Sequence, residues 1–572
     1  MFNKIAAIIP AAGRGQRMLS MTDKSPKSMF PVANKPLISY HLDDLYSNGI
    51  TDVYIIVGYK KEVLINYVNM MYSDKLNITF VVQTELLGLA HAINLAMNEI
   101  INKDYTGVYI ALGDNLIRNN NVYTLAKESK NSFILYKPVS DYSRWCLVNV
   151  DKYNNIINFM DKPEYEPKDK NAVIGIYYFN EIKDFKKALD DVIGLNIKIK
   201  GEYQLSSVME YYINKYEHPI KAIESKENEW FDFGELETYN ESKKLFNSSR
   251  CFNNIVYNSD NTITKKSSNY NKLQKEIIWF LSLPKSLQKY IPKLIEYSLV
   301  DDNVYYTLEY VNGTPLQELF IYNYLNNEDW SKIFELINKL IKDMKNVSKP
   351  HSNDLFKFLY NNYHNRLLRI HDESSKLLQE LIDNECDFIT INNISYLTFN
   401  MLKEYINDKL NYFKDDTKYS QIIHGDLVFS NMIYDIGSNN LKLIDPRGDF
   451  NGDIIYGDIR YDIAKIAQCV FGKYDYIVND LTKIPNISYN NEDGTYSIKY
   501  DIYNIDDSTF IDNIFTEFLE KNNFNKSEIL FITAMQFLTM IPLHSENEHH
   551  QIMMFIKFIE LMNAAKKLDE IK

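Results

Sequence analysis

Short apolar runs alternate with longer amphipathic segments through the first 112 residues of the chain. Strands that alternate with helices form mainly parallel sheets, and strands buried on both faces appear as continuous apolar stretches. The pattern therefore predicts an α/β fold at the start of the chain. The expected strands are residues 5–9, 53–57, 78–82 and 108–112, and the expected helices are residues 37–46, 62–71 and 90–101.

Shorter strand-like segments with tight turns follow. Turn residues stand at Asn154-Asn155 and at Lys162-Pro163. These features predict an antiparallel insertion beside the parallel sheet. The strand-like segments are residues 132–136, 147–150, 156–160 and 173–179.

The length of 572 residues predicts more than one domain, because single cores stop growing at roughly 250–300 residues. The polar cluster Asn247, Ser248 and Ser249 marks a domain joint, so we predict domains over 1–247 and 248–572. In the second domain we expect a small mixed lobe at about 250–313 and a helical lobe at about 314–572. The expected strands are 254–257, 262–265 and 305–311, and the expected helices are 273–281, 316–324, 330–344, 354–370 and 396–413.

Charge and cysteine usage exclude several classes of function. The chain has 76 Asp and Glu against 63 Lys and Arg, a formal net charge of -13. Such a balance predicts no nucleic-acid partner and no membrane partner, and no run of about 18 apolar residues predicts a membrane span. The four cysteines form no CxxC pair, so neither a disulfide framework nor a zinc site is expected. These features favour a cytoplasmic protein, with homo-oligomerisation left open.

Glycines and cations follow the first apolar run. Ala12, Gly13 and Gly15 stand at its end, and Arg17 and Lys27 follow. Glycine lets a backbone approach a phosphate closely, where its N–H groups bind anionic oxygens. Tight turns use glycine as well, so the surrounding motifs decide the interpretation.

Those motifs resemble the sugar-1-phosphate nucleotidyltransferase family through about residue 246. The resemblance implies a Rossmann-like domain with a mixed sheet, Mg²⁺, a pyrimidine nucleoside triphosphate such as UTP or dTTP, and a sugar-1-phosphate. The matching segments are 13–17, 25–27, 30–37, 82–83, 87–92, 112–115, 161–163, 175–177, 201–205 and 230–234.

The resemblance implies a role for each matching residue. Arg17 and Lys27 would bind the triphosphate and stabilise the transition state, with Ala12, Gly13 and Gly15 beside it. The remaining roles are pyrimidine contact for Gln83 and Gly88, Mg²⁺ binding for Asp114 and Asp232, and sugar-phosphate binding for Asp161, Lys162 and Gly175. Cys146 stands where hexose-specific relatives have Gly, and Ser206 where many have Thr. We therefore expect a reshaped sugar pocket.

A second set of polar residues lies far downstream. Asp426, Asn431 and Asp445 have the types needed for phosphoryl transfer from ATP, namely a carboxylate for the acceptor hydroxyl and oxygen ligands for Mg²⁺. Their spacing resembles the aminoglycoside phosphotransferase and choline kinase superfamily, which implies a bilobal protein-kinase-like α+β domain. Residues 444–448 and 461–464 are similar to kinase-like proteins of bacterial capsule and surface-glycan pathways.

The same resemblance assigns residues in the small lobe. Lys265 would reach the ATP phosphates with Glu276 as its ion-pair partner, and Glu309 and Val311 would lie at the adenine hinge. No Gly-rich loop is present, so residues 258–261 are expected to cover the phosphates.

Two further features have weaker implications. Arg447 is predicted to pair with a carboxylate such as Asp458 rather than to touch a substrate phosphate. His544, Glu546, His549 and His550 lack a helical i, i+4 histidine pair, so they do not predict a metal site.

Together the two sites suggest a bifunctional enzyme. It would phosphorylate a sugar at the anomeric hydroxyl with ATP and then join a nucleotidyl group to the sugar-1-phosphate. Two alternatives stay open: a choline kinase fused to a phosphocholine cytidylyltransferase, and a nucleotidyltransferase with an inactive kinase-like binding module.

Overall fold

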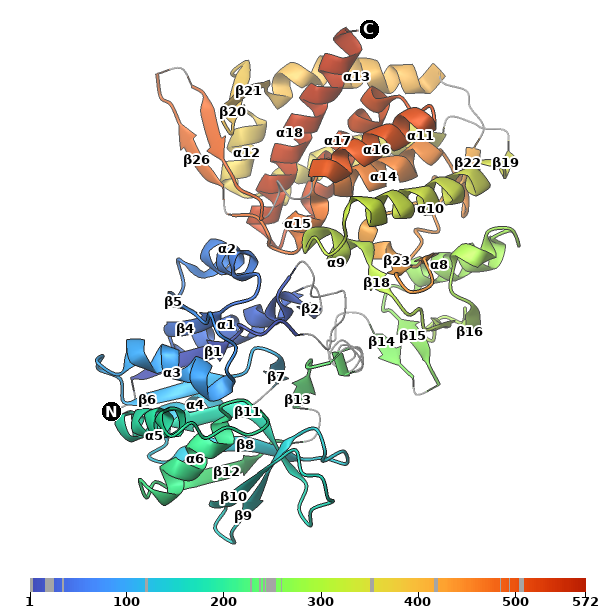
Figure 1. Cartoon of the computed structure of the whole chain (residues 1–572). Helices are drawn as coiled ribbons and strands as arrows, with labels where there is room; N and C mark the ends of the chain where they lie inside the picture. Colours follow the sequence, from blue (N-terminus) through green and yellow to red (C-terminus); the bar gives the residue numbers. More distant parts are fainter. Residues whose placement is uncertain are drawn as a thin grey trace. The chain divides into compact units, whose positions relative to one another are not determined.

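The computed structural model divides into two compact units, Met1–Ser249 and Arg250–Lys572, here called unit 1 and unit 2 (Figure 1). Each unit has its own core and is described separately. The structure describes residues 4–15, 25–32, 35–118, 122–226, 229–235, 238–239, 242, 254–258, 260–349, 354–415, 420–483, 485–492, 494–503 and 509–571.

Unit 1 contains a mixed sheet, and this confirms the predicted α/β fold. Its parallel part has the order β6-β1-β4-β5. The predicted two-sided burial holds for β1, β4 and β6 but is wrong for β5, which is half exposed because it is the edge strand. The elements are β1 Ile5–Pro10, β4 Asp52–Val57, β5 Asn77–Val82, β6 Gly107–Ala111, and helices α1 Leu37–Ser47, α2 Lys61–Tyr72, α3 Leu89–Ile100 and α4 Val122–Glu128.

The antiparallel strands continue the same sheet. β11 pairs antiparallel with β6, β8 and β9, and β12 joins the far side of β8 in parallel. The expected insertion is therefore an extension of one nine-stranded sheet within the described residues. The elements are β8 Ser132–Pro138, β9 Cys146–Val150, β10 Ile156–Asp161, β11 Asn171–Phe179, β12 Ile220–Glu224, α5 Ile182–Gly194 and α6 Leu205–Asn214.

A small antiparallel ribbon lies outside the main sheet of unit 1. Strand β7 (Asn115–Ile117) pairs with β13 (Trp230–Asp232), two segments more than 100 positions apart in sequence. A second two-stranded sheet pairs β2 (Pro31–Val32) with β3 (Lys35–Pro36). The predicted domain joint at Asn247, Ser248 and Ser249 lies outside the described residues.

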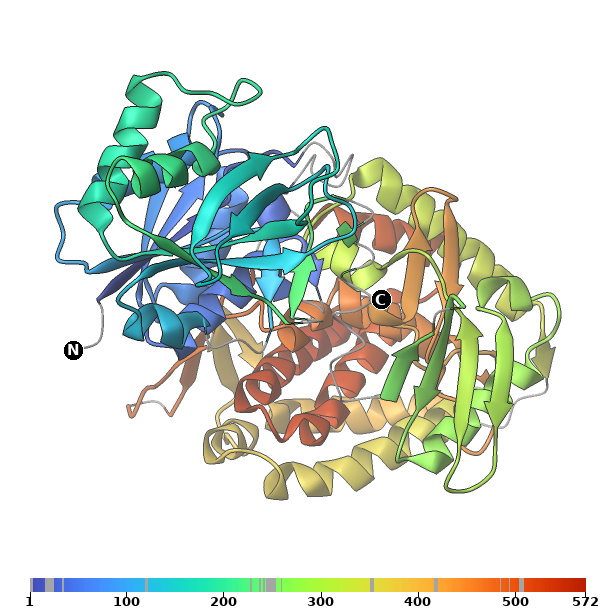
Figure 2. The ribbon, with the colours of Figure 1, turned by 90° about the horizontal axis from the view of Figure 1, so that it is seen from below.

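Unit 2 begins with an antiparallel sheet in the order β14-β15-β17-β16, drawn in green in Figure 2. Helix α8 buries Ile277 and Trp279. The predicted strand at 305–311 is too long, because the ladder ends at Glu309, and strand β16 had not been predicted. The elements are β14 Asn254–Tyr257, β15 Thr262–Lys266, α8 Tyr270–Ser282, β16 Leu294–Ser298 and β17 Tyr305–Glu309.

The rest of unit 2 is mostly helical, as predicted, with α17 packed along α18 (Figure 1). The helices are α9 Leu316–Ile321, α10 Asn327–Lys345, α11 Asp354–Asp372, α12 Lys376–Ile382, α13 Phe399–Asp415, α14 Ile459–Val470, α15 Tyr474–Val478, α16 Thr509–Lys521, α17 Lys526–Met540 and α18 Glu548–Glu570.

Several short sheets interrupt these helices, and the helix predicted from residue 396 is wrong at its start. Tyr396 lies in strand β21, and the helix begins at Phe399. The strands are β18 Thr314–Pro315, β19 Ser348–Lys349, β20 Phe388–Ile391, β21 Ile394–Leu397, β22 Ser420–Ile422, β23 Met432–Asp435, β24 Asn440–Leu443, β25 Tyr456–Gly457, β26 Asn486–Tyr489 and β27 Tyr496–Lys499.

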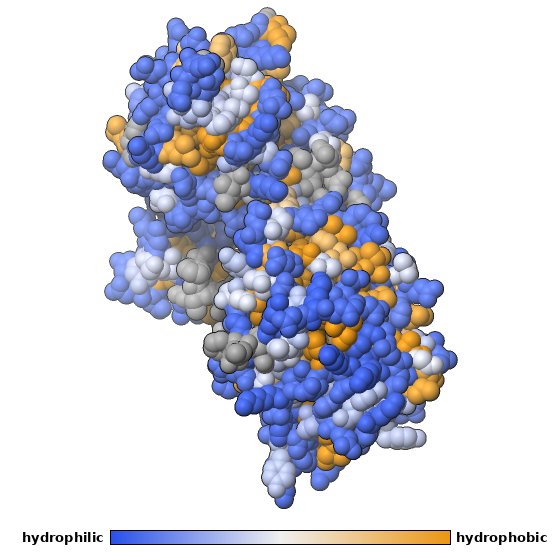
Figure 3. Space-filling view, turned by 90° about the vertical axis from the view of Figure 1, so that its left-hand side faces the viewer, coloured by the Kyte–Doolittle hydropathy of each residue, from blue (hydrophilic) through white to orange (hydrophobic). Residues whose placement is uncertain are grey.

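One segment of the described chain, Lys526–His544, is long and apolar enough to cross a membrane, but 89% of it is buried inside the protein. Its mean hydropathy therefore reflects a core helix, since α17 packs against α14 and α18. On the face drawn in Figure 3, hydrophilic residues separate the apolar patches from one another.

Candidate functional sites

The loop after β1 has room for a ligand next to its backbone. A Cβ atom at Gly13 would meet nothing within 4 Å, so the packing of the chain does not itself require glycine there. Ala12 lies against the loop after β4: its carbonyl accepts a hydrogen bond of 3.1 Å from the backbone N–H of Tyr59. Gly15 has a φ of 66°. Arg17 lies outside the described residues.

The predicted nucleotide and metal residues follow the carboxyl ends of parallel strands. Asp114 follows β6, Gly13 follows β1 and Gln83 follows β5. The chain proceeds from β1 to β4 and β5 and then crosses to β6 on the other side of β1, so the order of the strands reverses between β1 and β6. Ligands of open α/β sheets bind at such a point. Three strand spacings separate β6 from β5, roughly 14 Å.

The ribbon of β7 and β13 brings the two predicted metal ligands together. Asp232 pairs with Asn115 in the ribbon, and the N–H of Phe233 donates to the carbonyl of Asp114 at 2.9 Å. Burial and the neighbouring Asp114 raise the pKa of Asp232. Two buried carboxylates at one point repel each other, and a cation between them relieves that repulsion.

Lys27 is the cation that the chain itself supplies. Its Nζ donates to Asp114 Oδ2 at 2.7 Å and to the carbonyl of Gly234 at 2.7 Å. Burial, the largest influence, would raise the pKa of Asp114, but the charge and hydrogen bond of Lys27, together with a backbone hydrogen bond, lower it overall. Asp114 is therefore ionised and ready to bind a metal ion.

Three side chains around this carboxylate pair had no predicted role. Arg144 forms ion pairs with Asp232 at 3.5 Å and with Glu235 at 3.7 Å. Asn115 Nδ2 donates to Asp114 Oδ1 at 2.8 Å, and the indole of Trp230 donates to Asn115 Oδ1 at 2.8 Å. The adjacency of Asn115 to Asp114 and of Trp230 to Asp232 was the available signal, whereas nothing marked Arg144.

His41 lies buried on the other side of Asp114. Burial lowers the pKa of His41 to about 4, against the opposing effect of the Asp114 carboxylate. The imidazole is therefore neutral at pH 7, and its Nε2 atom has no hydrogen-bond partner. Its neutrality leaves Lys27 as the cation on Asp114.

The predicted base-contacting segment is held by the chain around Tyr203. Gly88 has a φ of 111°, and a Cβ there would lie 2.6 Å from the carbonyl oxygen of Tyr203. The Tyr203 N–H donates to the carbonyl of Leu87 at 2.8 Å. Gln83 is buried, with Nε2 3.4 Å from Nδ1 of His91. The motif around Tyr203 thus positions the Gly88 loop.

The predicted sugar residues lie on two faces of the antiparallel strands. Asp161 pairs with Cys146 across β9 and β10, and the N–H of Lys162 donates to the carbonyl of Trp145 at 2.9 Å. Burial and Asp161 raise the pKa of the Cys146 thiol, so it is a neutral wall of the site. Gly175 has a φ of 80°, and a Cβ there would lie 2.9 Å from Leu112 Cδ1.

In unit 2 the predicted lysine, glutamate and aspartate meet. Lys265 Nζ lies 2.8 Å from Glu276 Oε2 and 3.1 Å from Asp445 Oδ1. The hydroxyl of Tyr306, opposite Lys265 in the β15–β17 pair, donates to Glu276 at 3.0 Å. Lys265 and Glu276 are buried. Two anionic partners hold the ammonium at the edge of the cavity described below.

The predicted acceptor residue lies on the loop after β22. Asn431 Nδ2 donates to the carbonyl of Asp426 at 2.9 Å, and Lys465 Nζ lies 3.1 Å from Asp426 Oδ1. Burial, the largest influence, opposes ionisation of Asp426, but Lys465, His424 and Arg447 together lower the pKa of Asp426. Asp462 accepts from the N–H groups of His424 at 2.6 Å and Gly425 at 2.8 Å, and burial raises its pKa to about 7. Lys465 and Asp462 had no predicted role.

Little in the structure bears on the adenine hinge. Glu309 ends β17 opposite Thr262, and its N–H donates to the carbonyl of Lys293 at 2.9 Å. Val311 follows in the loop that leads to β18. The proposed phosphate-covering turn at 258–261 includes residue 259, which is outside the described residues.

The predicted pairing of Arg447 with Asp458 is wrong. Asp458 is bound by Arg460 at 2.6 Å, whereas the Arg447 guanidinium lies 4.6 Å from the centre of the Phe358 ring and donates to the carbonyl of Asp449. Asp458 is the N-cap of α14, and Arg460 in the first turn of the same helix binds it.

The histidines near residue 546 each have a different partner. His549 Nε2 contacts Thr482 Oγ1 at 2.7 Å, and His550 Nε2 contacts Asp480 Oδ1 at 2.8 Å. Within the described residues, no group of three or more His, Cys, Asp or Glu side chains is arranged to hold a metal ion.

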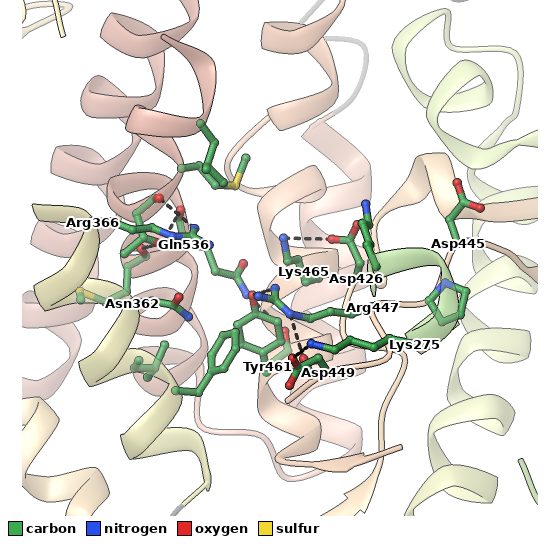
Figure 4. A pocket seen from close by; sticks show the side chains of 18 of the residues that line it. Lys275, Asn362, Arg366, Asp426, Asp445, Arg447, Asp449, Tyr461, Lys465 and Gln536 are labelled. Atoms are coloured by element: carbon green, nitrogen blue, oxygen red, sulfur yellow. Dashed lines mark hydrogen bonds and ion pairs between the residues drawn. The ribbon is translucent and has the colours of Figure 1, made fainter. Parts of the chain in front are cut away.

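A cavity of about 540 Å³ in unit 2 is lined by many polar residues (Figure 4). Asp426 and Asp445 line it together with side chains from helices α8, α11, α14 and α17. Its volume falls within the range of small-molecule sites, about 300–1,000 Å³. The charged residues that line it are Lys272, Lys275, Arg366, Asp426, Asp445, Arg447, Asp449 and Lys465.

Comparison with known proteins gives relatives for the first part of the chain. The UTP–glucose-1-phosphate uridylyltransferase AglF of Haloferax volcanii is 31% identical over 212 residues, 36% of this chain and 83% of that protein. The low-salt glycan biosynthesis nucleotidyltransferase Agl11 of the same organism is 28% identical, over 42% of this chain and 65% of Agl11. The match to the bifunctional protein GlmU of Methanococcus aeolicus spans 51% of that relative.

Among solved structures, UDP-glucose pyrophosphorylase complexed with UDP-glucose is 24% identical with a TM-score of 0.37, covering 43% of this chain and 99% of that one. A family model described as nucleotidyl transferase matches residues 6–249. Through these residues, the chain belongs to the nucleotidyl transferase family.

Proposed function

We propose that unit 1 transfers a nucleotidyl group from a pyrimidine nucleoside triphosphate to a sugar-1-phosphate and releases pyrophosphate. The observation that carries this proposal is the meeting of Asp114, Asp232 and Lys27 beyond the carboxyl ends of the parallel strands. The names of AglF and Agl11, which describe nucleotidyl transfer, support it.

The residues fit a magnesium ion. Mg²⁺ is commonly bound through one or two carboxylates plus substrate phosphates, and Asp114 and Asp232 are two buried carboxylates of which one is ionised by Lys27. The bound ion would offset charge on the phosphate oxygens during displacement.

The chain's own groups have separate tasks in this reaction. A phosphate oxygen of the sugar-1-phosphate attacks the α-phosphorus, and the bond from the α-phosphorus to the pyrophosphate oxygen breaks. Lys27, which contacts Asp114, would stabilise charge on the phosphates, as would Arg17. Ala12, Gly13 and Gly15 bind phosphates through the backbone, and Gln83 and Gly88 contact the base. Asp161, Lys162 and Gly175 bind the sugar phosphate.

For unit 2 we infer a phosphotransferase with a protein-kinase-like bilobal fold, its small lobe formed by β14–β17 and α8. The carrying observation is the convergence of Lys265, Glu276 and Asp445 at the cavity that also contains Asp426. Lys265 would bind ATP phosphates, and Asn431 and Asp445 would hold Mg²⁺. Glu309 and Val311 would lie at the adenine.

In this reaction Asp426 accepts the proton of the acceptor hydroxyl. The hydroxyl oxygen forms a bond to the γ-phosphorus, the bond to the β–γ bridging oxygen breaks, and ADP leaves. Because Lys465 keeps Asp426 ionised, the carboxylate orients the hydroxyl from the start and takes its proton late.

The two activities fit in series, with domains over 1–247 and 248–572. Unit 2 makes a phosphate ester, and unit 1 activates one. We propose that the shared intermediate is a sugar-1-phosphate made by phosphorylation of the anomeric hydroxyl, as part of surface-glycan synthesis.

One assay tests both halves. The full chain is incubated with Mg²⁺, ATP, the other nucleoside triphosphates, free sugars and choline, and the products are identified by mass. A UDP- or dTDP-sugar made from a free sugar supports the proposal. Formation of CDP-choline would refute the sugar substrate and support a choline kinase fused to a phosphocholine cytidylyltransferase. A parallel incubation replaces the free sugars with sugar-1-phosphates, and nucleotide sugar made only there would leave unit 2 as an inactive binding module.

A further inference from the structure

The cavity of unit 2 contains two arginines without an ion-pair partner among the described carboxylates. Arg366 on α11 donates through Nη1 to the carbonyl of Thr539 at 3.0 Å. Arg447 donates through Nε to the carbonyl of Asp449 at 3.0 Å and lies 3.4 Å from the Tyr461 hydroxyl. Both guanidiniums line the cavity, and Figure 4 shows them on the same side of Asp445.

The carboxylates of the cavity are already bound by other cations. Asp426 pairs with Lys465 at 3.1 Å, and Asp449 pairs with Lys275 at 2.5 Å. Asp445 pairs with Lys265 from β15. The two arginines therefore form no direct ion pair with the described carboxylates, although Arg447 lies in the field of Asp426 and Asp449, in a chain whose net charge is -13. Burial and the charge of Arg447 both lower the pKa of Arg366, which places the two guanidiniums in each other's field.

Two of the aromatic rings that line the cavity, Phe358 and Tyr461, are covered by the chain itself. Arg447 lies over the Phe358 ring, and Phe450 stacks on the same ring at a centroid distance of 4.4 Å. The Tyr461 ring is occupied by Lys465, with Nζ 5.9 Å from its centre. A quaternary ammonium group needs free aromatic faces, and these rings do not offer them.

Gln536 adds a neutral acceptor. Its side chain on α17 is only 3% exposed, its Nε2 donates to the carbonyl of Tyr461 at 3.4 Å, and its Oε1 has no partner. A rotated amide would place Oε1 against the Tyr461 carbonyl, so this orientation is the favourable one. Oε1 is itself buried, but its side chain lines the cavity, and a small turn of the amide would let a ligand hydroxyl donate to it.

We propose that the alcohol phosphorylated by unit 2 carries an anionic group, a carboxylate or a phosphate, which pairs with Arg366 and Arg447. Guanidinium groups bind such anions through paired, charge-assisted hydrogen bonds. Gln536 Oε1 accepts from another hydroxyl of the same molecule, while the reacting hydroxyl lies at Asp426. This inference rests on the phosphotransferase function proposed above and narrows its acceptor to an anionic sugar.

Binding of four probes tests the charge preference. Glucuronate, glucose 6-phosphate, glucose and choline are titrated by calorimetry into the full chain with saturating ADP and Mg²⁺. We expect at least one of the two anions to bind about tenfold or more tightly than glucose, and choline to bind most weakly. The stronger anion distinguishes a carboxylate from a phosphate. Equal or tighter binding of glucose or choline overturns the inference.

Variants of α11 provide the matched control. Arg366→Gln is expected to lower anion affinity about tenfold and to change glucose affinity less than twofold, while Arg366→Lys restores part of the loss. Arg369→Gln removes an arginine one turn away that pairs with Glu373 on the surface, and it should change neither. An anion preference that survives Arg366→Gln contradicts the assignment.

Formation of ADP from ATP tests the phosphotransferase function separately from the anionic acceptor. Arg366-dependent anion binding without phosphorylation of any probe would refute the phosphotransferase function but leave the ligand charge assigned. Phosphorylation of glucose or choline in preference to both anions would support the phosphotransferase and refute the anionic acceptor.

Discussion

Both units place a lysine on an aspartate proposed to bind metal, but they hold that lysine differently. Lys27 contacts Asp114 and the carbonyl of Gly234, each at 2.7 Å. Lys265 contacts Asp445 at 3.1 Å and a second carboxylate, Glu276, at 2.8 Å. The second anchor is a neutral backbone dipole in unit 1 and a full negative charge in unit 2.

This difference separates a movable cation from a fixed one. If a metal ion bound Asp114, Lys27 would lose the one ion pair that it forms among the described side chains. Its ammonium could then move toward the phosphates. When a metal ion takes Asp445, Lys265 keeps Glu276 and stays in place. Unit 1 therefore suits charge that shifts during the reaction, and unit 2 suits a nucleotide held in one position.

Removing each lysine should give the largest effects. We expect Lys27→Met to lower pyrophosphate release about a thousandfold and Lys265→Met to lower ADP formation by a similar factor, each without effect on the other reaction. Both products are measured in the same samples. Lys35→Met, which removes a half-exposed lysine paired with Asp43, is the control for loss of positive charge in unit 1. Loss of both activities in one variant would contradict the independence of the two sites.

Two buried groups, one in each unit, should respond to pH with opposite sign. Burial raises the pKa of Asp475 in unit 2 to about 7, from 3.8 in the unfolded chain. Between about pH 4 and pH 7 the folded state keeps a proton that the unfolded chain has lost. Each pH unit in that window therefore costs about 1.4 kcal/mol of stability. His41 in unit 1 has the opposite sign: its pKa is lowered to about 4, so its contribution is lost as pH falls from 6.5 to 4.

Asp475→Asn tests the first of these slopes. Relative to the wild type, the variant should become steadily more stable from pH 4.5 to pH 7, as measured by the midpoint of unit 2 unfolding in urea. Asp408→Asn, at an exposed position on α13, should run parallel to the wild type. Parallel curves for Asp475→Asn and the wild type would show that Asp475 does not titrate in this range.

The second anchor of Lys265 is tested by Glu276→Gln. We expect ADP formation to fall about thirtyfold, because the lysine keeps one anionic partner and shifts toward Asp445. The Michaelis constant for ATP should rise as well, which a purely structural defect would not explain. An unchanged rate of ADP formation would show that Glu276 does not hold Lys265 in place, and the proposed difference between Lys265 and Lys27 would be wrong. Glu296→Gln, on β16 of the same sheet, is the control.

The smallest effect is expected from Arg144→Gln. Its guanidinium lies 3.5 Å from Asp232, so its loss makes the carboxylate pair more negative. We expect the Mg²⁺ concentration for half-maximal pyrophosphate release to fall about threefold, while the Michaelis constant for the sugar-1-phosphate rises by a similar factor. A rise in the Mg²⁺ requirement would contradict this placement. Arg118→Gln is the matched arginine control, because Arg118 lies over Phe231.

Much of unit 1 was predictable, because apolar runs of strand length are a direct consequence of burial on two faces. The exposed edge strand β5 is an apolar run much like β4, so its position in the sheet is what distinguishes them. Asp114 and Asp232 were predictable as residues. Their meeting depends on the β7–β13 pair, whose two strands of three residues are too short to give a pattern.

In unit 2 the sequence contains a signal for a hairpin that was not predicted. Asn392 and Asn393 have φ values of 46° and 65°, the geometry of a two-residue hairpin turn, and they lie between two apolar runs. The helix predicted from residue 396 concealed this hairpin. Arg366 had no signal, because its role depends on which carboxylates the other cations occupy.

The spacing of the Lys265 contacts has a consequence for synthesis on the ribosome. Glu276 follows Lys265 by 11 positions, whereas Asp445 follows it by 180. At roughly 5–20 residues per second, Asp445 is translated about 10–40 s after Lys265. During that interval Glu276 is the carboxylate that can neutralise Lys265. The Lys265–Glu276 ion pair can therefore form in the nascent small lobe before the rest of the cavity has been synthesised.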